Sequence, residues 1–265
     1  MIKLIVSDLD GTLLQEDNTV KQDDRESLKE ALQDGFQISI ATGRMDIEIQ
    51  EVLKSIGERF HRISQNGAFT STVDNQAIFS KTFDPSLARK IYNKVRPLNV
   101  ITLLCNYDTN FTEENNEYVE GIQKRMFHPI VIDPKLTDKF ESIMPSKITL
   151  LGFENDIIKI YEELAAEHGE EIDIYISEKQ VLDIMPKKIS KGNALSKLLD
   201  YLEIKEEEIA CIGDSFNDIP MFKLTPYSYV ISHAHDSVKK EASFVVNSVS
   251  DAVAQIRREN MKLVK

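Results

Sequence analysis

Two aspartates that follow directly on a run of apolar residues are the first place where this chain could do chemistry. The opening segment IKLIVSDLDGTLL carries Asp8 and Asp10 behind a short, β-branched run that predicts a buried strand. In an extended segment both side chains project from one face, so both carboxylates can reach one small ligand. Gly11 and Thr12 then break the strand into a turn, and open α/β sheets bind ligands at such strand ends. For Asp-x-Asp alone, a solvated acidic turn is the alternative.

A second polar strand end follows thirty residues later. The apolar run from Phe36 to Ala41 leads directly into Thr42, Gly43 and Arg44. A hydroxyl and backbone N–H groups at such a turn can donate hydrogen bonds to a phosphate oxygen. Taken alone the segment is more typical of a plain turn. Arg44 has two interpretations, contact with a substrate phosphate or pairing with a neighbouring carboxylate.

A lysine with a fixed direction is predicted near residue 190. Ser190 is a suitable N-cap, and leucines follow at helical spacing, so Lys191 should lie on the first turn of a packed helix. Lys187 and Lys188 are better explained as a solvated linker.

The strongest acidic segment after the opening one is GDSFND, residues 213–218, which follows the buried run 209–212. Polar and acidic groups at a strand end pack poorly in a core and suit a metal ion. Asp214, Asn217 and Asp218 are the candidate side chains. Should a phosphomonoester bind here, its two negative charges and those of Asp8 and Asp214 would exceed the single positive charge of Lys191. A divalent cation is therefore expected, and all-oxygen ligands suit Mg²⁺ best.

These segments resemble the four signature motifs of the haloacid dehalogenase superfamily, whose members use an aspartate to attack phosphate esters. DLDGTLL, ATGR, KGNAL and GDSFND occur in the family's order. The resemblance implies that Asp8 is the nucleophile and Asp10 the general acid and base. It implies a Mg²⁺ held by Asp8, the Asp10 carbonyl and Asp214, with Asp218 supporting Lys191 or a metal-bound water. The implied phosphate contacts are Leu9 (backbone), Thr42, Gly43, Lys191 and Asn217.

The spacing of the segments predicts two domains. The gap from Arg44 to Lys191 is too long for one crossover connection. Within it, helical patterns at 86–95, 118–126 and 156–167 alternate with strand patterns at 101–105, 148–152, 172–176 and 181–185. We expect an α/β fold, with a Rossmann-like parallel sheet and helices on both faces formed by 1–82 and 187–265. Residues 83–186 should form an inserted α+β domain, which in the resembled family is the large type-two cap.

Composition limits the partners. The chain has 265 residues and a formal net charge of −12, which argues against nucleic acid because binding a phosphate backbone needs a basic face. No apolar run approaches the ~18 residues that span a bilayer. The two cysteines, Cys105 and Cys211, lie in apolar runs typical of reduced thiols. Asp8 follows Met1 too closely for a signal peptide, so we expect a cytoplasmic protein, monomeric or weakly self-associating.

The resemblance implies a Cof-type, Mg²⁺-dependent phosphatase acting on sugar phosphates, nucleotides or phosphorylated cofactors through an aspartyl-phosphate. A phosphomutase or other phosphotransferase using the same nucleophile is an alternative, and it requires cap arginines that grip a second phosphate. The candidates are few: Arg89, Arg96 and Arg125. A non-catalytic sensor is a third possibility, but it predicts the loss of a catalytic residue. His233 and His235 are interpreted as surface residues.

Overall fold

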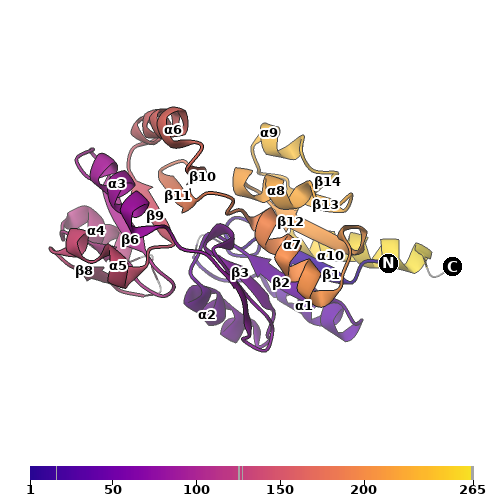
Figure 1. Ribbon diagram of the computed structural model, residues 1–265. Helices are drawn as coiled ribbons and strands as arrows, with labels where there is room; N and C mark the ends of the chain where they lie inside the picture. Colours follow the sequence, from indigo (N-terminus) through magenta and orange to yellow (C-terminus); the bar gives the residue numbers. More distant parts are fainter. Residues whose placement is uncertain (16, 125, 127, 264–265) are drawn as a thin grey trace. The chain divides into compact units, whose positions relative to one another are not determined.

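The computed structural model describes residues 1–15, 17–124, 126 and 128–263, and the chain divides into two compact units. The first unit comprises residues 1–80 with 190–265, and the second comprises residues 81–189 (Figure 1). The predicted domain boundaries, 83 and 186, lie within a few residues of these limits. Among the described residues, no helix has the length and apolar character needed to cross a membrane.

An eight-stranded sheet forms the centre of the first unit, in the order β14-β13-β12-β1-β2-β3-β4-β5. The pairs from β14 to β3 are parallel, and β4 and β5 add an antiparallel hairpin at one edge. The hairpin turns at Asn75, which has φ +63°. The strands are β1 Leu4–Ser7, β2 Gln37–Ala41, β3 His61–Ser64, β4 Phe69–Ser71, β5 Ala77–Ser80, β12 Ile209–Gly213, β13 Ser228–Ile231 and β14 Phe244–Val246.

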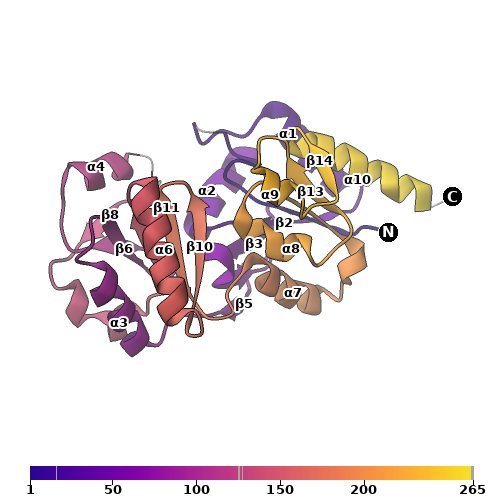
Figure 2. The same cartoon turned by 90° about the horizontal axis from the view of Figure 1, so that it is seen from above.

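Helices cover both faces of this sheet because successive strand residues point to opposite sides. Ile5 packs in a core with α1 (Gln22–Gln33), α2 (Asp46–Ile56) and α10 (Val249–Leu263). Its neighbours Leu4 and Val6 pack in the opposite core with α7 (Lys191–Leu202), α8 (Ile219–Phe222) and α9 (Asp236–Lys239). Helices α1 and α10 lie side by side (Figure 2). The short 3₁₀ turns are η1 Gln65–Gly67, η3 Glu206–Glu208 and η4 Phe216–Asp218. The predicted parallel α/β core is confirmed.

The second unit has its own six-stranded sheet, in the order β10-β11-β9-β6-β7-β8. All its pairs are antiparallel except β7 with β8. Helices α3 (Pro85–Val95), α5 (Phe140–Ile143) and α6 (Glu154–His168) pack on one face, while α4 (Glu117–Gln123) packs beside β6 and β8 on the other. The remaining elements are β6 Ile101–Cys105, β7 Asn110–Thr112, β8 Ile130–Ile132, η2 Leu136–Asp138, β9 Lys147–Leu151, β10 Ile172–Glu178 and β11 Val181–Pro186.

Parallel pairing decides where polar side chains of the first unit gather. Strands β12, β1 and β2 run in the same direction and in register, with Ser7 opposite both Ile212 and Ile40. Their carboxyl ends therefore meet at one edge of the sheet. The loops after β1, β2 and β12, which carry all the predicted side chains except Lys191, begin at this edge.

Candidate active site

Asp8 directly follows the last residue of the central strand β1. Its N–H donates to the carbonyl of Ile212 at 2.8 Å, which is the last contact of β1 with β12. The residue is 4% exposed. The next turn is tight, because Gly11 has φ +76° and a Cβ there would collide with Oδ2 of Asp214. Only glycine lets the loop after β1 approach the loop after β12 so closely.

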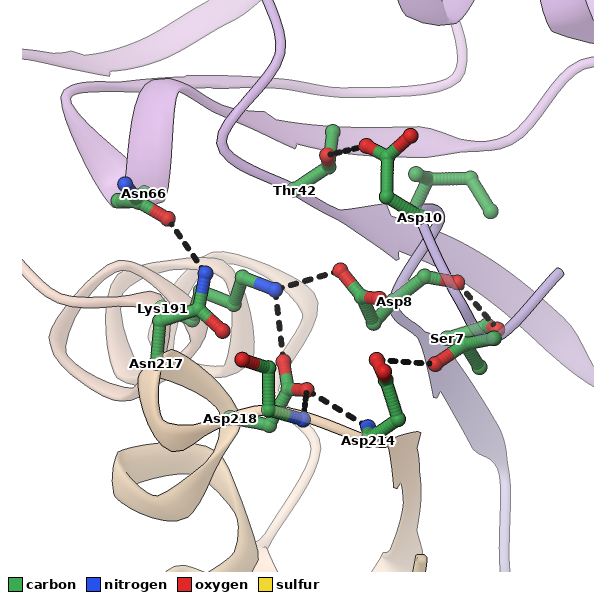
Figure 3. Close-up of polar contacts among 12 residues, drawn as sticks. Ser7, Asp8, Asp10, Thr42, Asn66, Lys191, Asp214, Asn217 and Asp218 are labelled. Atoms are coloured by element: carbon green, nitrogen blue, oxygen red, sulfur yellow. Dashed lines mark hydrogen bonds and ion pairs between the residues drawn. The ribbon is translucent and has the colours of Figure 1, made fainter. Parts of the chain in front are cut away.

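A buried lysine joins two of the predicted carboxylates. Lys191 Nζ lies 2.6 Å from Oδ1 of Asp8 and 2.6 Å from Oδ1 of Asp218 (Figure 3). The side chains of Lys191 and Asp218 are 0% exposed. Lys191 is the first residue of α7, and the Ser190 hydroxyl accepts the N–H of Asn193 at 3.0 Å, so the predicted N-cap is confirmed. The cap fixes the helix start and with it the direction of the lysine.

The protonation equilibria of this cluster reflect burial and excess negative charge. Burial is the main reason that the pKa of Asp8 is raised well above its ordinary value, and nearby carboxylates add to the effect. Burial likewise raises the pKa of Asp214, with repulsion from Asp218 in support. Burial opposes the charge on Lys191, but attraction to Asp218 and Asp8 outweighs it and raises the pKa of the ammonium group.

Three carboxylates lie close enough to share one cation. Single oxygens of Asp8, Asp214 and Asp218 lie within 4.8 Å of one another. Against one ammonium group they leave a formal charge of −2. The residues therefore fit Mg²⁺, which prefers oxygen ligands.

The carboxylate of Asp218 accepts hydrogen bonds that fix the loop after β12. Its Oδ2 accepts the N–H groups of Asp214 and Ser215, each at 2.9 Å, while its Oδ1 accepts from Lys191. This agrees with its predicted supporting place, and it leaves Asp8 and Asp214 as the side chains with oxygens to offer. Thr12 also donates its hydroxyl to Oδ1 of Asp214 at 3.1 Å.

Asp10 has different surroundings. Its side chain is 40% exposed, and it turns toward Thr42 while Asp8 faces Lys191 (Figure 3). Arg44 Nε lies 2.9 Å from each carboxylate oxygen, and Nη2 lies 2.6 Å from Oδ1. The Thr42 hydroxyl is 3.4 Å from Oδ2. Of the two interpretations of Arg44, pairing with a carboxylate is the one that the structure displays.

The other predicted phosphate contacts lie in the loops at this edge. The buried Thr42 receives a hydrogen bond from the N–H of Asn66 at 2.9 Å, and the half-buried Gly43 follows it. The Leu9 carbonyl accepts N–H groups of the turn that follows, including that of Leu14 at 2.7 Å. Asn217 is buried, and its Oδ1 has no hydrogen-bond partner among the described residues.

Asn66 is a residue whose place the sequence did not reveal. Its Oδ1 accepts from Nδ2 of Asn217 at 3.0 Å. It lies in η1, where Gln65, Asn66 and Gly67 have φ of 47°, 54° and 105°. A Cβ at Gly67 would collide with the carbonyl of Ser190, so the turn presses against the start of α7. The Asn-Gly pair was a visible signal, but it predicts only a turn.

The contacts of Asn18 and His233 were also not predicted. Asn18 Oδ1 accepts from Nη2 of Arg44 at 2.8 Å. His233 was interpreted as a surface residue, and its side chain is 59% exposed, yet its Nε2 lies 3.4 Å from Oδ2 of Asp214. Both contacts join segments far apart in the chain, and no local pattern marks them.

The cap arginines proposed for a second phosphate have partners in the second unit. Arg89 pairs with Glu141 at 2.9 Å and donates to the Thr137 carbonyl, and Arg96 pairs with Glu113 at 2.6 Å. Arg125 lies outside the described residues.

Comparison with known proteins agrees with this geometry. A family model described as haloacid dehalogenase-like hydrolase matches residues 5–256. The 5-amino-6-(5-phospho-D-ribitylamino)uracil phosphatase YwtE of Bacillus subtilis is 26% identical, over 93% of each chain. Phosphatase YwpJ of the same organism is 25% identical, over 98% of this chain and 96% of its own.

Solved structures extend the likeness to three dimensions. TM0651 from Thermotoga maritima superposes with a TM-score of 0.83 at 26% identity, covering 96% of this chain and 97% of its own. BT1666 from Bacteroides thetaiotaomicron, described among phosphatases of the haloalkanoate (HAD) superfamily, has a TM-score of 0.81 at 25% identity. That match covers 97% of this chain and 95% of the other.

Proposed function

This chain belongs to the haloacid dehalogenase-like hydrolase family, and from that premise we propose that it is a Mg²⁺-dependent phosphatase of small phosphomonoesters that works through an aspartyl-phosphate. The observation that carries the proposal is the buried cluster of Asp8, Lys191 and Asp218 beside Asp214. A carboxylate held at the end of a central strand, with a lysine fixed against it, suits nucleophilic attack on a bound phosphoryl group.

In the first step an oxygen of Asp8 attacks phosphorus, and the bond from phosphorus to the ester oxygen breaks. Asp10 gives its proton to the departing alkoxide. Lys191 balances charge on the phosphoryl oxygens, and donors from Thr42 and Asn217 orient them. Positioning and charge stabilisation provide most of the rate in phosphoryl transfer, which explains why these side chains are fixed by burial.

In the second step water attacks the phosphorus of the aspartyl-phosphate. Asp10 takes the proton of that water, and the bond between Asp8 and phosphorus breaks to release inorganic phosphate. Asp8 returns as a carboxylate and Asp10 returns protonated, so the cycle closes without any further reactant.

The residues that would hold Mg²⁺ are Asp8, Asp214 and the backbone carbonyl of Asp10, with Asp218 fixing the loop. When bound, the ion supplies positive charge that lets the Asp8 carboxylate and the phosphate dianion come together. The formal charge of −2 on the described cluster supports this assignment.

We assign the second unit, residues 81–189, to the family's large type-two cap, the domain that sets substrate specificity, and infer small soluble esters as substrates. The name of the relative YwtE, a 5-amino-6-(5-phospho-D-ribitylamino)uracil phosphatase, supports a phosphorylated metabolite as substrate. Hydrolysis is favoured over the phosphomutase alternative because Arg89 and Arg96 are held by Glu141 and Glu113. The reduced, buried thiols of Cys105 and Cys211 support a cytoplasmic location.

A screen of purified protein with Mg²⁺ tests the proposal. The panel comprises p-nitrophenyl phosphate, sugar phosphates, nucleotides, flavin mononucleotide and pyridoxal phosphate, with phosphate release as the readout. We expect turnover of at least one ester by the wild type and none by Asp8→Asn. Phosphoryl transfer to a second sugar, without release of phosphate, would favour the phosphotransferase.

A further inference from the structure

Arg44 restrains the carboxylate of Asp10 through a fork of hydrogen bonds. Nε is equidistant from both oxygens at 2.9 Å, and Nη2 adds a shorter contact of 2.6 Å to Oδ1. A planar guanidinium that binds both oxygens fixes the plane of a carboxylate as well as its distance, which a lysine ammonium does not do. The fork therefore determines which way Asp10 faces.

Arg44 is itself held at both ends. Its N–H donates to the Thr42 hydroxyl at 3.2 Å, and its carbonyl accepts the N–H of Gln65 at 2.8 Å, so its backbone is fixed to the loops after β2 and β3. At the other end, Nη2 also donates to Oδ1 of Asn18 at 2.8 Å.

The turn that carries Asn18 fixes the direction of its amide. Asn18 has φ +60°, a left-handed conformation that asparagine tolerates better than most residues. Its N–H donates to the carbonyl of Gln15 at 3.0 Å, and the N–H of Gln15 donates to the carbonyl of Thr19 at 2.9 Å. Asn18, Arg44 and Asp10 thus form a chain of contacts within the first unit.

We propose that Arg44 is a positioning residue that, supported by Asn18, holds the Asp10 carboxylate in the orientation from which it exchanges protons with the leaving group and with water. The inference rests on the proposed phosphatase function and adds two residues to it. Arg44 acts through Asp10 and not through the phosphate. The fall in kcat when Arg44 is replaced should therefore be largest for esters whose leaving group must be protonated.

The first test compares Arg44→Lys with the wild type on two esters. For an alkyl phosphate such as glycerol phosphate we expect kcat to fall roughly 10–100-fold, because a misplaced acid loses much of its catalytic effect. The initial burst of p-nitrophenolate from p-nitrophenyl phosphate should change less than about threefold, since this leaving group departs without protonation. KM and the inhibition constant of inorganic phosphate should stay the same.

Asn18 offers a graded pair of variants. Asn18→Gly keeps the left-handed turn but removes the amide oxygen, and it should lower kcat on the alkyl ester by roughly 3–10-fold, less than Arg44→Lys. Asn18→Asp keeps an oxygen for Nη2 and should restore most of the activity. A merely structural role for the turn would not distinguish these two variants by leaving group.

Two further variants complete the design. In the Asp10→Asn background, Arg44→Lys should cause no additional loss on the alkyl ester, because the group that it positions is gone. Arg257→Lys is the matched control, since Arg257 contacts Glu30 and Asp34 at 2.6 and 2.7 Å elsewhere in the same unit. It should leave all parameters unchanged.

Each other outcome overturns the inference. If Arg44→Lys raises KM and the phosphate inhibition constant equally for both esters, Arg44 contacts the phosphate instead. If its effect adds to that of Asp10→Asn, it does not act through Asp10. A wild type inert toward every ester refutes the proposed function and the positioning role together, whereas an active wild type with a leaving-group-independent Arg44 variant refutes only the latter.

Discussion

Asp8 and Asp10 lie two residues apart in the chain, but their surroundings differ in burial and in partner. Asp8 faces a lysine that is 0% exposed, within a cluster of three carboxylates. Asp10 is 40% exposed and is held by a guanidinium that is 20% exposed. A nucleophile needs one fixed direction of attack, and burial among charges provides it. In the proposed mechanism the acid and base must meet both a leaving group and water, and the partial exposure of Asp10 gives it that access.

The largest effects are expected when each of the two aspartates is replaced by asparagine and the two variants are compared. Asp8→Asn should reduce turnover of all esters by roughly 10⁴-fold or more, because an amide cannot attack phosphorus. Asp10→Asn should slow alkyl esters by roughly 10²–10⁴-fold and transfer from p-nitrophenyl phosphate by less.

Labelled phosphoenzyme separates the two roles of the aspartates. It should accumulate in Asp10→Asn, where the base for water is lost, and should be absent in Asp8→Asn. Equal residual activity of the two variants on both esters would contradict the division of labour.

Removal of divalent metal should act on the Asp8 cluster and leave the Asp10 fork intact. With a chelator, turnover of p-nitrophenyl phosphate should vanish and return with Mg²⁺, while Ca²⁺ should inhibit through its larger, looser coordination shell. Mg²⁺ at about 100 times its Kd should also stabilise the fold by about 2.7 kcal/mol.

Thermal unfolding is the readout of metal binding that does not depend on activity. The Mg²⁺-induced rise in Tm should disappear in Asp214→Asn and persist in Arg44→Lys. Undiminished turnover in the presence of the chelator would show that the reaction does not require a metal ion.

Unfolding free energies measured without metal should distinguish the clusters by burial. Lys191→Met leaves three carboxylates without a cation and should cost about 3–5 kcal/mol. Arg44→Gln breaks a half-exposed pair and should cost about 0–1 kcal/mol, because solvent screens the interaction. Urea denaturation at one pH measures both. Similar losses in the two variants would mean that burial does not separate the clusters.

The strands and caps that position Asp8 could be predicted because their signals are local. The apolar runs before Asp8, Thr42 and Asp214 end where β1, β2 and β12 end, within one or two residues. Ser190 predicts the start of α7, and the structure places its cap there. In the second unit, the apolar or alternating runs also predict β6, β9, β10 and β11.

The missed features depend on contacts between distant segments. Strands β7 and β8 have three residues each, too few for a period to be recognised, and they exist because β6 and α4 provide partners. Asn66 and Asn18 lie in turns whose sequences predict a turn and nothing more. Their contacts with Asn217 and Arg44 span 151 and 26 residues. Tertiary pairing alone brings such side chains into a site.

The smallest expected effect on stability comes from His61, which lies outside both the Asp8 cluster and the Asp10–Arg44 pair. It limits the pH range in which the variants of these two groups can be compared. Its ring is buried, Nδ1 accepts the N–H of Val73 at 3.1 Å, and Nε2 lies 2.9 Å from Oε1 of Gln37. The bond from Val73 requires an unprotonated Nδ1, so the proton lies on Nε2. Burial lowers the pKa of His61, and protonation would break the Val73 bond.

Because the folded pKa of His61 is lowered, the unfolded chain binds more protons below the ordinary histidine value of about 6.5. Its contribution is therefore fully present above that pH and is lost as pH falls toward the folded pKa. We expect the unfolding free energy to decline as the pH is lowered from 7 to 5, and His61→Gln to flatten that decline. Urea denaturation at half-unit steps measures the slope, with His235→Gln on the surface as control. A slope that His61→Gln leaves unchanged would assign the acid sensitivity to groups other than His61, and not to Asp8 or Asp214, because their raised pKa values favour the folded state as the pH falls.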